Sequence, residues 1–179
     1  DPKFRIQVRN FVVYKLKKRK MNKTLKLLII SDIFVISGFG LIAPILAIFI
    51  KDNLTGGSIF YAGIASTIFL ITRSILQIVF ADKFDSKDRL WMLLLGTGII
   101  AFVPFGYIFS THIYHIFIVQ FIYGIGASFA YPSWVSLFSC NLDKGQRGYQ
   151  WSIYASCVGI GTAITAGTGA WLAQIIGFA

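Results

Sequence analysis

The sequence predicts an all-α fold, a polytopic membrane bundle of five transmembrane helices. Of its 179 residues, 56% are apolar and 13% are charged, whereas soluble domains typically have about 25% charged and roughly 45–50% apolar residues. The mean hydropathy of +0.71 leaves too little polar surface to cover a globule in water. This composition disfavours a disordered chain, a disulfide scaffold and an ordinary soluble enzyme.

The first two predicted spans cover residues 27–50 and 59–81. Each is a run of apolar residues long enough to cross a hydrocarbon core of about 30 Å at a helical rise of about 1.5 Å per residue. Each contains a single charged residue, Asp32 in the first span and Arg73 in the second. An ionisable group at membrane depth is costly, so both residues are candidates for function.

The other three predicted spans cover residues 90–110, 116–142 and 149–176 and contain no charged residue. His112 and His115 lie in the predicted turn between the third and fourth spans. Strands of a membrane barrel would be about ten residues long and would alternate in polarity. These runs are longer and continuously apolar, so they predict helices.

Basic residues gather on alternate sides of the spans. The chain contains seventeen Lys and Arg residues and seven Asp residues, and ten of the seventeen basic residues lie between Lys3 and Lys26. Three more lie in the loop 82–89 and two in the loop 143–148, whereas the opposite side carries only Lys51. The positive-inside rule therefore predicts a multi-pass protein of the cell (plasma or inner) membrane with a cytoplasmic N-terminus. A charge that follows membrane topology in this way argues against nucleic-acid binding.

These charges divide the chain into a basic cytoplasmic segment, residues 1–26, and a transmembrane bundle, residues 27–179. Within the basic segment, an apolar stripe at helical spacing is compatible with an amphipathic helix on the anionic inner leaflet, or with a plain solvated tail. The stripe consists of Phe4, Val8, Phe11 and Val12. Residue 1 is Asp and Met21 directly precedes the first span, so Met21 is a candidate start of translation.

No constellation in the sequence predicts a catalytic residue, a metal site or a cofactor. Cys140 and Cys157 have no second Cys or His at ligand spacing. No Ser/His pair or carboxylate cluster lies at reactive spacing, so an enzyme is not expected.

The loop after the second span carries alternating acidic and basic residues, including Asp82, Lys83, Lys87 and Arg89. This order resembles the loop signature of the major facilitator superfamily, G-x-x-x-D-[RK]-x-G-[RK]-[RK], between its second and third helices. Ile78 and Asp85 stand where the signature has glycine. The resemblance implies a cytoplasmic gate, in which Asp82 holds the end of a partner helix. A charge cluster that only sets the topology is the alternative, and the two roles are compatible.

The fourth span contains Gln120, Gly124 and Gly126, followed by Pro132. This order resembles the fourth-helix pattern R-x-x-x-G-x-G of the same family, with Gln120 in place of the arginine of proton-coupled members. Small residues such as these glycines let helix backbones approach closely in a membrane.

The fifth span carries Gly161 and Gly169, which resemble the outer glycines of the antiporter pattern G-x-x-x-G-P-x-x-G. Thr165 and Ala166 replace its central Gly-Pro. We therefore predict a helix-packing role for Gly161 and Gly169 and do not assign the antiporter subclass.

The resemblance covers nearly the whole chain from Met21 onward and corresponds to the first five of the usual twelve helices. It implies a secondary active transporter that moves a small solute by alternating access, with ion coupling, present here as a truncated N-terminal half. Its expected partners are the lipid bilayer, a small-molecule substrate and the missing C-terminal helices. The alternative is a non-transporting five-helix membrane protein that acts as an anchor or assembly partner.

Asp32 and Arg73 are the main candidates for substrate binding or proton coupling. Asp32 lies about 9 Å along the first helix from Lys26, and Arg73 lies roughly 13 Å from Asp82, at a rise of about 1.5 Å per residue. Antiparallel neighbours would place them at similar depths, so we expect them to approach one another or to share a polar cavity. A structural ion pair, or an Asp32 that stays hydrated near the interface, is the alternative.

The fourth span adds further cavity candidates, because amide and aromatic side chains often line solute sites. These candidates are Gln120, Tyr123, Tyr131 and Trp134.

Overall fold

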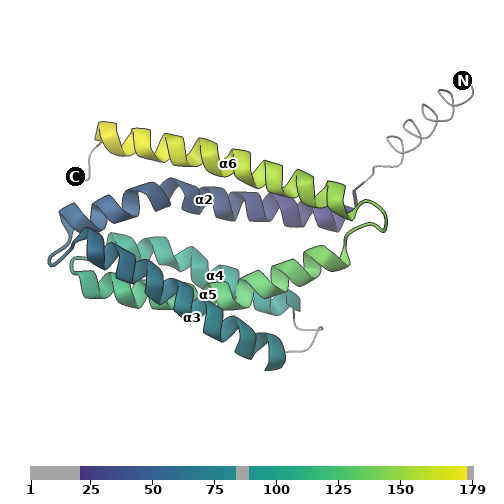
Figure 1. The fold of residues 1–179 in the computed structure, drawn as a ribbon, viewed down its shortest axis with the longest axis horizontal. Helices are drawn as coiled ribbons and strands as arrows, with labels where there is room; N and C mark the ends of the chain where they lie inside the picture. The colour runs from purple at the N-terminus through teal and green to yellow at the C-terminus, as the bar shows by residue number, and fades with distance from the viewer. Residues whose placement is uncertain (1–20, 84–88, 177–179) are drawn as a thin grey trace, which may run out of the picture.

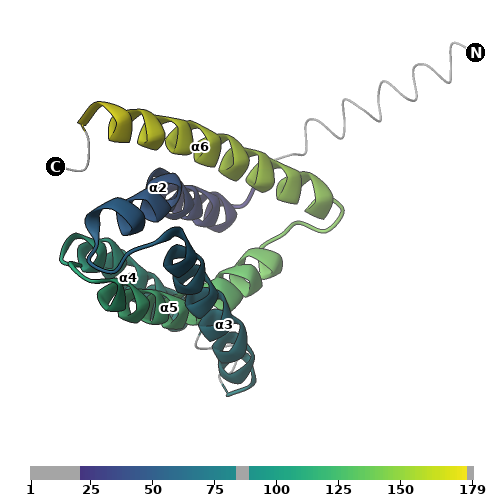
Figure 2. The same ribbon diagram turned by 60° about the vertical axis from the view of Figure 1, so that its left-hand side comes forward.

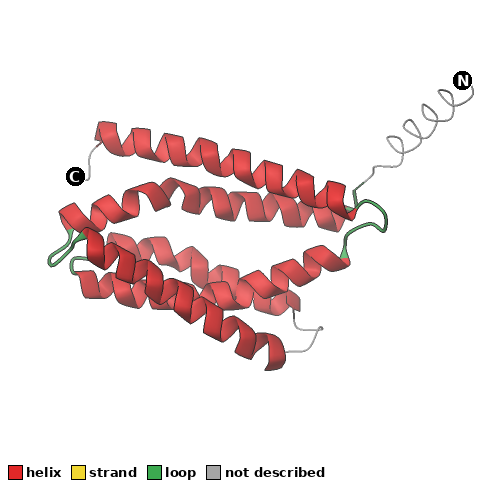
Figure 3. Ribbon diagram, in the orientation of Figure 1, coloured by secondary structure: helices red, strands yellow, loops and turns green. Residues whose placement is uncertain are grey.

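The computed structural model describes residues 21–83 and 89–176, and these form an all-helical bundle with no strand. Figure 3 shows helices joined by short loops. The helices are α2 (Lys23–Asn53), α3 (Ile59–Lys83), α4 (Arg89–Ile108), α5 (Ile113–Cys140) and α6 (Arg147–Ile176). The predicted all-α fold is thus confirmed, whereas the predicted amphipathic stripe within residues 1–20 and Lys87 lie outside the described residues.

All five helices are long and apolar enough to cross a membrane. Most extend a few residues beyond the predicted apolar runs, because polar residues at the ends of a run can continue a helix. α5 begins at Ile113, three residues before the apolar run predicted for the fourth span. His112 has extended backbone angles and caps α5, so His115 lies in the first turn of that helix and not in the loop.

The helices form two groups, which Figures 1 and 2 show from different sides. α6 packs along α2, while α3 and α4 both pack against α5. α2 also contacts α3 and α5 and so joins the two groups.

Small residues set the close contacts between helices. A Cβ atom added to Gly96 of α4 would lie 2.6 Å from the carbonyl oxygen of Gly126 in α5. A Cβ at Gly124 would lie 2.7 Å from the Cβ of Thr72 in α3. Backbones that approach this closely gain dispersion contacts in lipid, where no hydrophobic effect drives helices together.

The α2–α6 pair uses the same device. A Cβ at Gly161 would lie 2.7 Å from the Ser37 hydroxyl oxygen, and one at Gly169 would collide with the backbone of Leu41. The predicted packing glycines of the fourth and fifth spans therefore lie at helix contacts. Pro104 of α4 and Pro132 of α5 both lie inside their helices.

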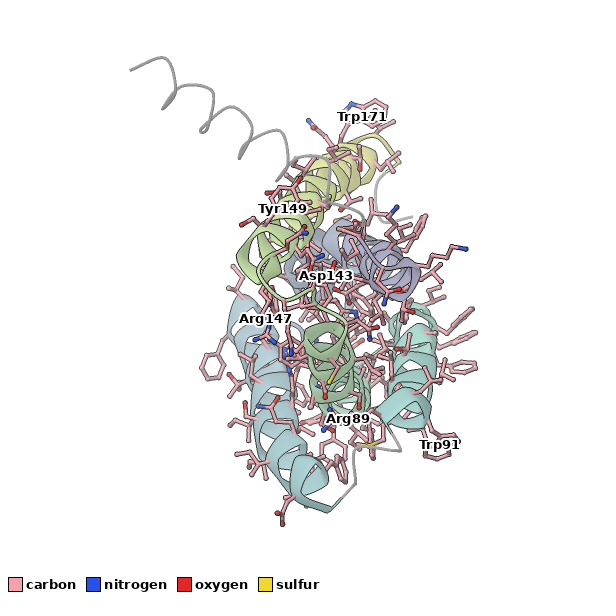
Figure 4. The ribbon with its side chains drawn as sticks, turned by 90° about the vertical axis from the view of Figure 1, so that its right-hand side faces the viewer. Arg89, Trp91, Asp143, Arg147, Tyr149 and Trp171 are labelled. Atoms are coloured by element: carbon pink, nitrogen blue, oxygen red, sulfur yellow. The ribbon has the colours of Figure 1, made fainter. Side chains whose placement is uncertain are left out.

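The two ends of the bundle differ in charge. We call the end where α2, α4 and α6 begin and where α3 and α5 finish the basic end, because Lys23, Arg89, Lys144 and Arg147 lie there. Figure 4 looks onto this end and labels Arg89, Asp143 and Arg147. At the other end, which we call the distal end, the short connections after α2 and α4 are joined by backbone hydrogen bonds between Thr55 and residues 111 and 113.

Candidate functional site

A cavity of about 410 Å³ lies between the two helix groups, toward the basic end. Every helix contributes to its lining. Its polar and aromatic lining residues are Ser31, Asp32, Phe39, Phe69, Arg73, Thr97, Tyr123, Tyr131, Trp134 and Tyr154. The cavity is within the size range of small-molecule sites, about 300–1,000 Å³.

Asp32 lies on the α2–α6 side of the cavity. Its carboxylate oxygen Oδ2 accepts a hydrogen bond from the Tyr154 hydroxyl at 2.6 Å. Since α2 and α6 both begin at the basic end, Asp32 and Tyr154 reach the same depth, nine and seven residues into their helices. This bond joins the two helices through a charged acceptor, which is the stronger kind of hydrogen bond.

Arg73 lies on the α3–α5 side. Its guanidinium carbon is 4.3 Å from the centroid of the Tyr131 ring, a cation–π arrangement between α3 and α5. The aromatic face partly balances the positive charge away from bulk water.

Asp32 and Arg73 line the same cavity and do not form an ion pair. In the described part of the chain, the carboxylate and cation that come within 4.0 Å are Asp52 and Lys51, at the distal end. The alternative of a structural Asp32–Arg73 ion pair is therefore not what the structure shows. Two opposite charges face one cavity from different helices, each held by a tyrosine.

Stacked aromatic rings line the cavity between the charged side chains and the distal end. The Tyr123 ring stacks on Phe39 of α2 at 4.8 Å and on Phe69 of α3 at 4.3 Å. The stack joins three helices and gives the cavity an apolar surface beside its charges.

A second aromatic group lies between the cavity and the basic end. We call it the aromatic cluster, and its members are Trp134, Phe138, Trp151 and Tyr154. The Trp134 and Phe138 rings stack at 4.7 Å, and Phe138 is fully buried. Trp134 and Tyr154 line the cavity, so the cluster covers the cavity on its basic side.

Gln120 does not line this cavity, unlike Tyr123 three residues later. Its side chain is only 4% exposed, and its Oε1 has no hydrogen-bond partner in the described structure. A buried carbonyl oxygen without a donor is unfavourable. The prediction that Gln120 is a cavity residue thus fails for this cavity, because its position on α5 turns it into the packed interior.

The predicted gate residues lie at the basic end, away from the cavity lining. Asp82 is exposed near the end of α3 and lines a separate surface hollow of about 640 Å³ with Pro132 and Ser136 of α5. Lys83 is the last residue of α3 and Arg89 the first of α4, whereas Lys87 is outside the described residues. The gate role of this loop stays a prediction.

Sequence reasoning missed five of the polar and aromatic residues that line the cavity: Ser31, Phe39, Phe69, Thr97 and Tyr154. Tyr154 had a usable signal, because the charge pattern makes the first and fifth spans parallel and so places Tyr154 at the depth of Asp32. The two phenylalanines had none, since any apolar residue at those positions fits a membrane helix equally well.

The sequence matches the family model of the Major Facilitator Superfamily over residues 28–179. No curated protein and no solved structure matches the chain.

Proposed function

Since the chain belongs to the major facilitator superfamily, a family of transporters, we propose that the cavity at Asp32 and Arg73 is where it binds a small solute during secondary active transport. In this proposal the solute crosses the membrane by alternating access, with this half of the transporter rocking against its remaining helices around the site. The proposal includes further helices that complete the transporter around these five.

The observation that carries the proposal is the pair of charged side chains in one cavity of an otherwise apolar bundle. Charged groups at membrane depth are unfavourable unless they serve a pathway or a partner. Neither Asp32 nor Arg73 is neutralised by an ion pair within the described residues. Both face a space large enough for a small molecule.

Ion coupling is assigned to Asp32. It is the carboxylate among the described residues that line the cavity, and Gln120, which replaces the arginine of the family pattern, carries no charge. Protonation of Asp32 would neutralise the carboxylate that now accepts the hydrogen bond from the Tyr154 hydroxyl. Proton binding would therefore change both the cavity's charge and the α2–α6 contact.

The orientation that we propose has the basic end in the cytoplasm of the cell (plasma or inner) membrane. The charge of the described residues supports this, because Lys23, Arg89, Lys144 and Arg147 lie at one end and the distal end carries Lys51 beside Asp52. Asp82, next to the α3–α4 connection, would then act as a gate on the cytoplasmic side.

The test is solute-driven proton movement in vesicles that contain the whole transporter, with Asp32→Asn compared with the wild type. We expect the variant to lose coupled transport, a reduction of about a hundredfold or more, in line with the loss of an essential charged group. Asp52→Asn is the matched control, since Asp52 is half exposed at the distal end. Unchanged coupling in Asp32→Asn would refute the assignment, and absence of any transport by the wild type would favour the anchor or assembly alternative.

A further inference from the structure

We propose that the cavity selects zwitterionic small molecules, with a cationic group placed at Asp32 and an anionic group at Arg73. This inference rests on the proposed function, because it names the solute class for the same cavity. It follows from how the structure separates two opposite charges that share one space.

The two charges are supported by different helices. Asp32 Oδ2 accepts a hydrogen bond from the Tyr154 hydroxyl, with the two oxygens 2.6 Å apart, and this bond connects Asp32 to α6. Arg73 lies over the Tyr131 ring at 4.3 Å, which ties it to α5. Each contact leaves part of the charged group free, because within the described residues neither the second carboxylate oxygen of Asp32 nor the N–H groups of Arg73 form an ion pair.

Opposite charges in one cavity of low polarity normally attract strongly. Here they stay more than 4.0 Å apart, because each is held on its own side of the cavity. A ligand that bridges them must therefore supply both counter-charges. A ligand with a single charge would neutralise one group and leave the other desolvated without a partner, which is unfavourable.

The rest of the lining suits the body of such a ligand. Phe39, Phe69 and Tyr123 form the stacked aromatic surface beside the charges. Leu93, Ile100 and Ala127 add further apolar surface. The site therefore combines charge recognition at two points with an apolar wall, as is usual for small-molecule sites.

The same chemistry occurs in a soluble amino acid and in the headgroup of phosphatidylethanolamine. Both carry an ammonium group and an anion a few bonds apart. The inference concerns the shared zwitterionic pattern, and the experiment separates the two sources.

The experiment measures binding to the whole transporter in nanodiscs of phosphatidylglycerol, which has no cationic group. The probes are phenylalanine and three derivatives with the same ring: phenylalaninamide (cation), N-acetylphenylalanine (anion) and N-acetylphenylalaninamide (neutral). A parallel leucine series removes dependence on the ring. We expect the zwitterion of at least one series to bind about tenfold or more tightly than its three derivatives, as expected for desolvated charge pairs.

Two variants assign the charges. Asp32→Asn should remove the advantage of the zwitterion over the anion, and Arg73→Gln should remove its advantage over the cation. Asp32→Glu should restore the preference in part, and Arg147→Gln at the basic end is a charge-matched control. Misfolding would weaken the binding of all four ligands together. It therefore cannot explain a loss of preference over the anion in one variant and over the cation in the other.

Titrating phosphatidylethanolamine into the discs separates the sources. If phosphatidylethanolamine displaces the bound zwitterion from the wild type but not from Asp32→Asn or Arg73→Gln, the natural ligand is a lipid headgroup. If the affinity for the zwitterion stays unchanged, the natural ligand is a soluble solute. Equal binding of all four probes, tighter binding of a singly charged probe, or no binding in either series would overturn the inference.

The outcomes also distinguish this inference from the proposed function. Asp32-dependent transport of a singly charged solute would support the proposed transport function and refute the inference that the cavity selects zwitterions. A preference for zwitterions in a protein that transports no solute would support the inference and refute the proposed transport function.

Discussion

At the distal end of the bundle, α2, α3, α4 and α5 meet in an uncharged hydrophobic cluster that includes Ile50, Ala65, Val103, Ile116 and the ring of Tyr107. Toward the basic end, these helices and α6 surround a cavity with two charges, and the buried cluster beside it combines Leu25 and Ile29 with the rings of Trp134 and Phe138. The apolar cluster gains its stability from dispersion contacts between closely fitting side chains. The cavity gives up such contacts and holds its charges by single interactions with tyrosines.

Under the proposed function, the distal end would stabilise the helix arrangement, while the basic half would bind the solute. A substitution in the distal cluster should then change stability more than ligand affinity, and one in the cavity should do the opposite. The following variants test that division, from the largest expected effect to the smallest.

The largest effect is expected from Gly96→Leu in α4. The added side chain would collide with the backbone of α5, since even a Cβ there lies 2.6 Å from the Gly126 carbonyl oxygen. We expect loss of folded protein in size-exclusion chromatography from detergent. Gly98→Leu is the matched control on the same helix, because nothing lies within 4 Å of a Cβ at Gly98. Equal yields of the two variants would contradict the close α4–α5 contact.

A smaller loss of stability is expected from Ile116→Ala in the distal cluster. Ile116 is fully buried, and truncating such a side chain to alanine typically costs about 2–5 kcal/mol. The free energy of unfolding, measured by denaturant titration in detergent, should fall by this amount while solute affinity stays constant. Ile118→Ala is the control, since Ile118 is 59% exposed. A changed affinity in Ile116→Ala would break the proposed division between the two regions.

Tyr154→Phe should show the opposite behaviour. It keeps the ring in the aromatic cluster and removes the hydrogen bond to Asp32. We expect coupled transport to fall about tenfold, as for loss of a hydrogen bond to a charged group, with little change in thermal stability. Tyr114→Phe, at the distal end and 72% exposed, should leave transport unchanged. A stability loss as large as that of Ile116→Ala would show that this contact is mainly structural.

The smallest effect is expected from Asp52→Asn. The Asp52–Lys51 pair is 3.7 Å apart and half exposed on both sides, so its removal should change stability by less than about 1 kcal/mol. Thermal unfolding and transport should both match the wild type. A large effect on transport would show that a functional charge lies at the distal end and would contradict the proposed division between the two regions.

Much of the fold followed from the sequence. The five helices come from apolar runs of membrane-spanning length, and Gly124, Gly126, Gly161 and Gly169 lie where helices approach closely. α5 begins before the apolar run of the fourth span: His112 is extended and pairs with Thr55, so the helix starts at Ile113 and includes His115.

The candidate site was predictable in part. Asp32 and Arg73 stood out because charge is rare in membrane spans, and both line one cavity. Of their partners, Tyr131 was among the predicted cavity candidates, whereas Tyr154 did not stand out among the eight tyrosines of the chain. Gln120 lies one helical turn before Gly124, which contacts α3, and it is buried away from the cavity.

The sequence by itself determined how many helices cross the bilayer and where its charges gather, since both follow from the cost of moving polar groups into hydrocarbon. Only the tertiary structure decided that Asp32 bonds to Tyr154 instead of Arg73, and that Gln120 is buried in packing. Those outcomes depend on how each helix is rotated about its axis, and the contacts of all its neighbours set that rotation together.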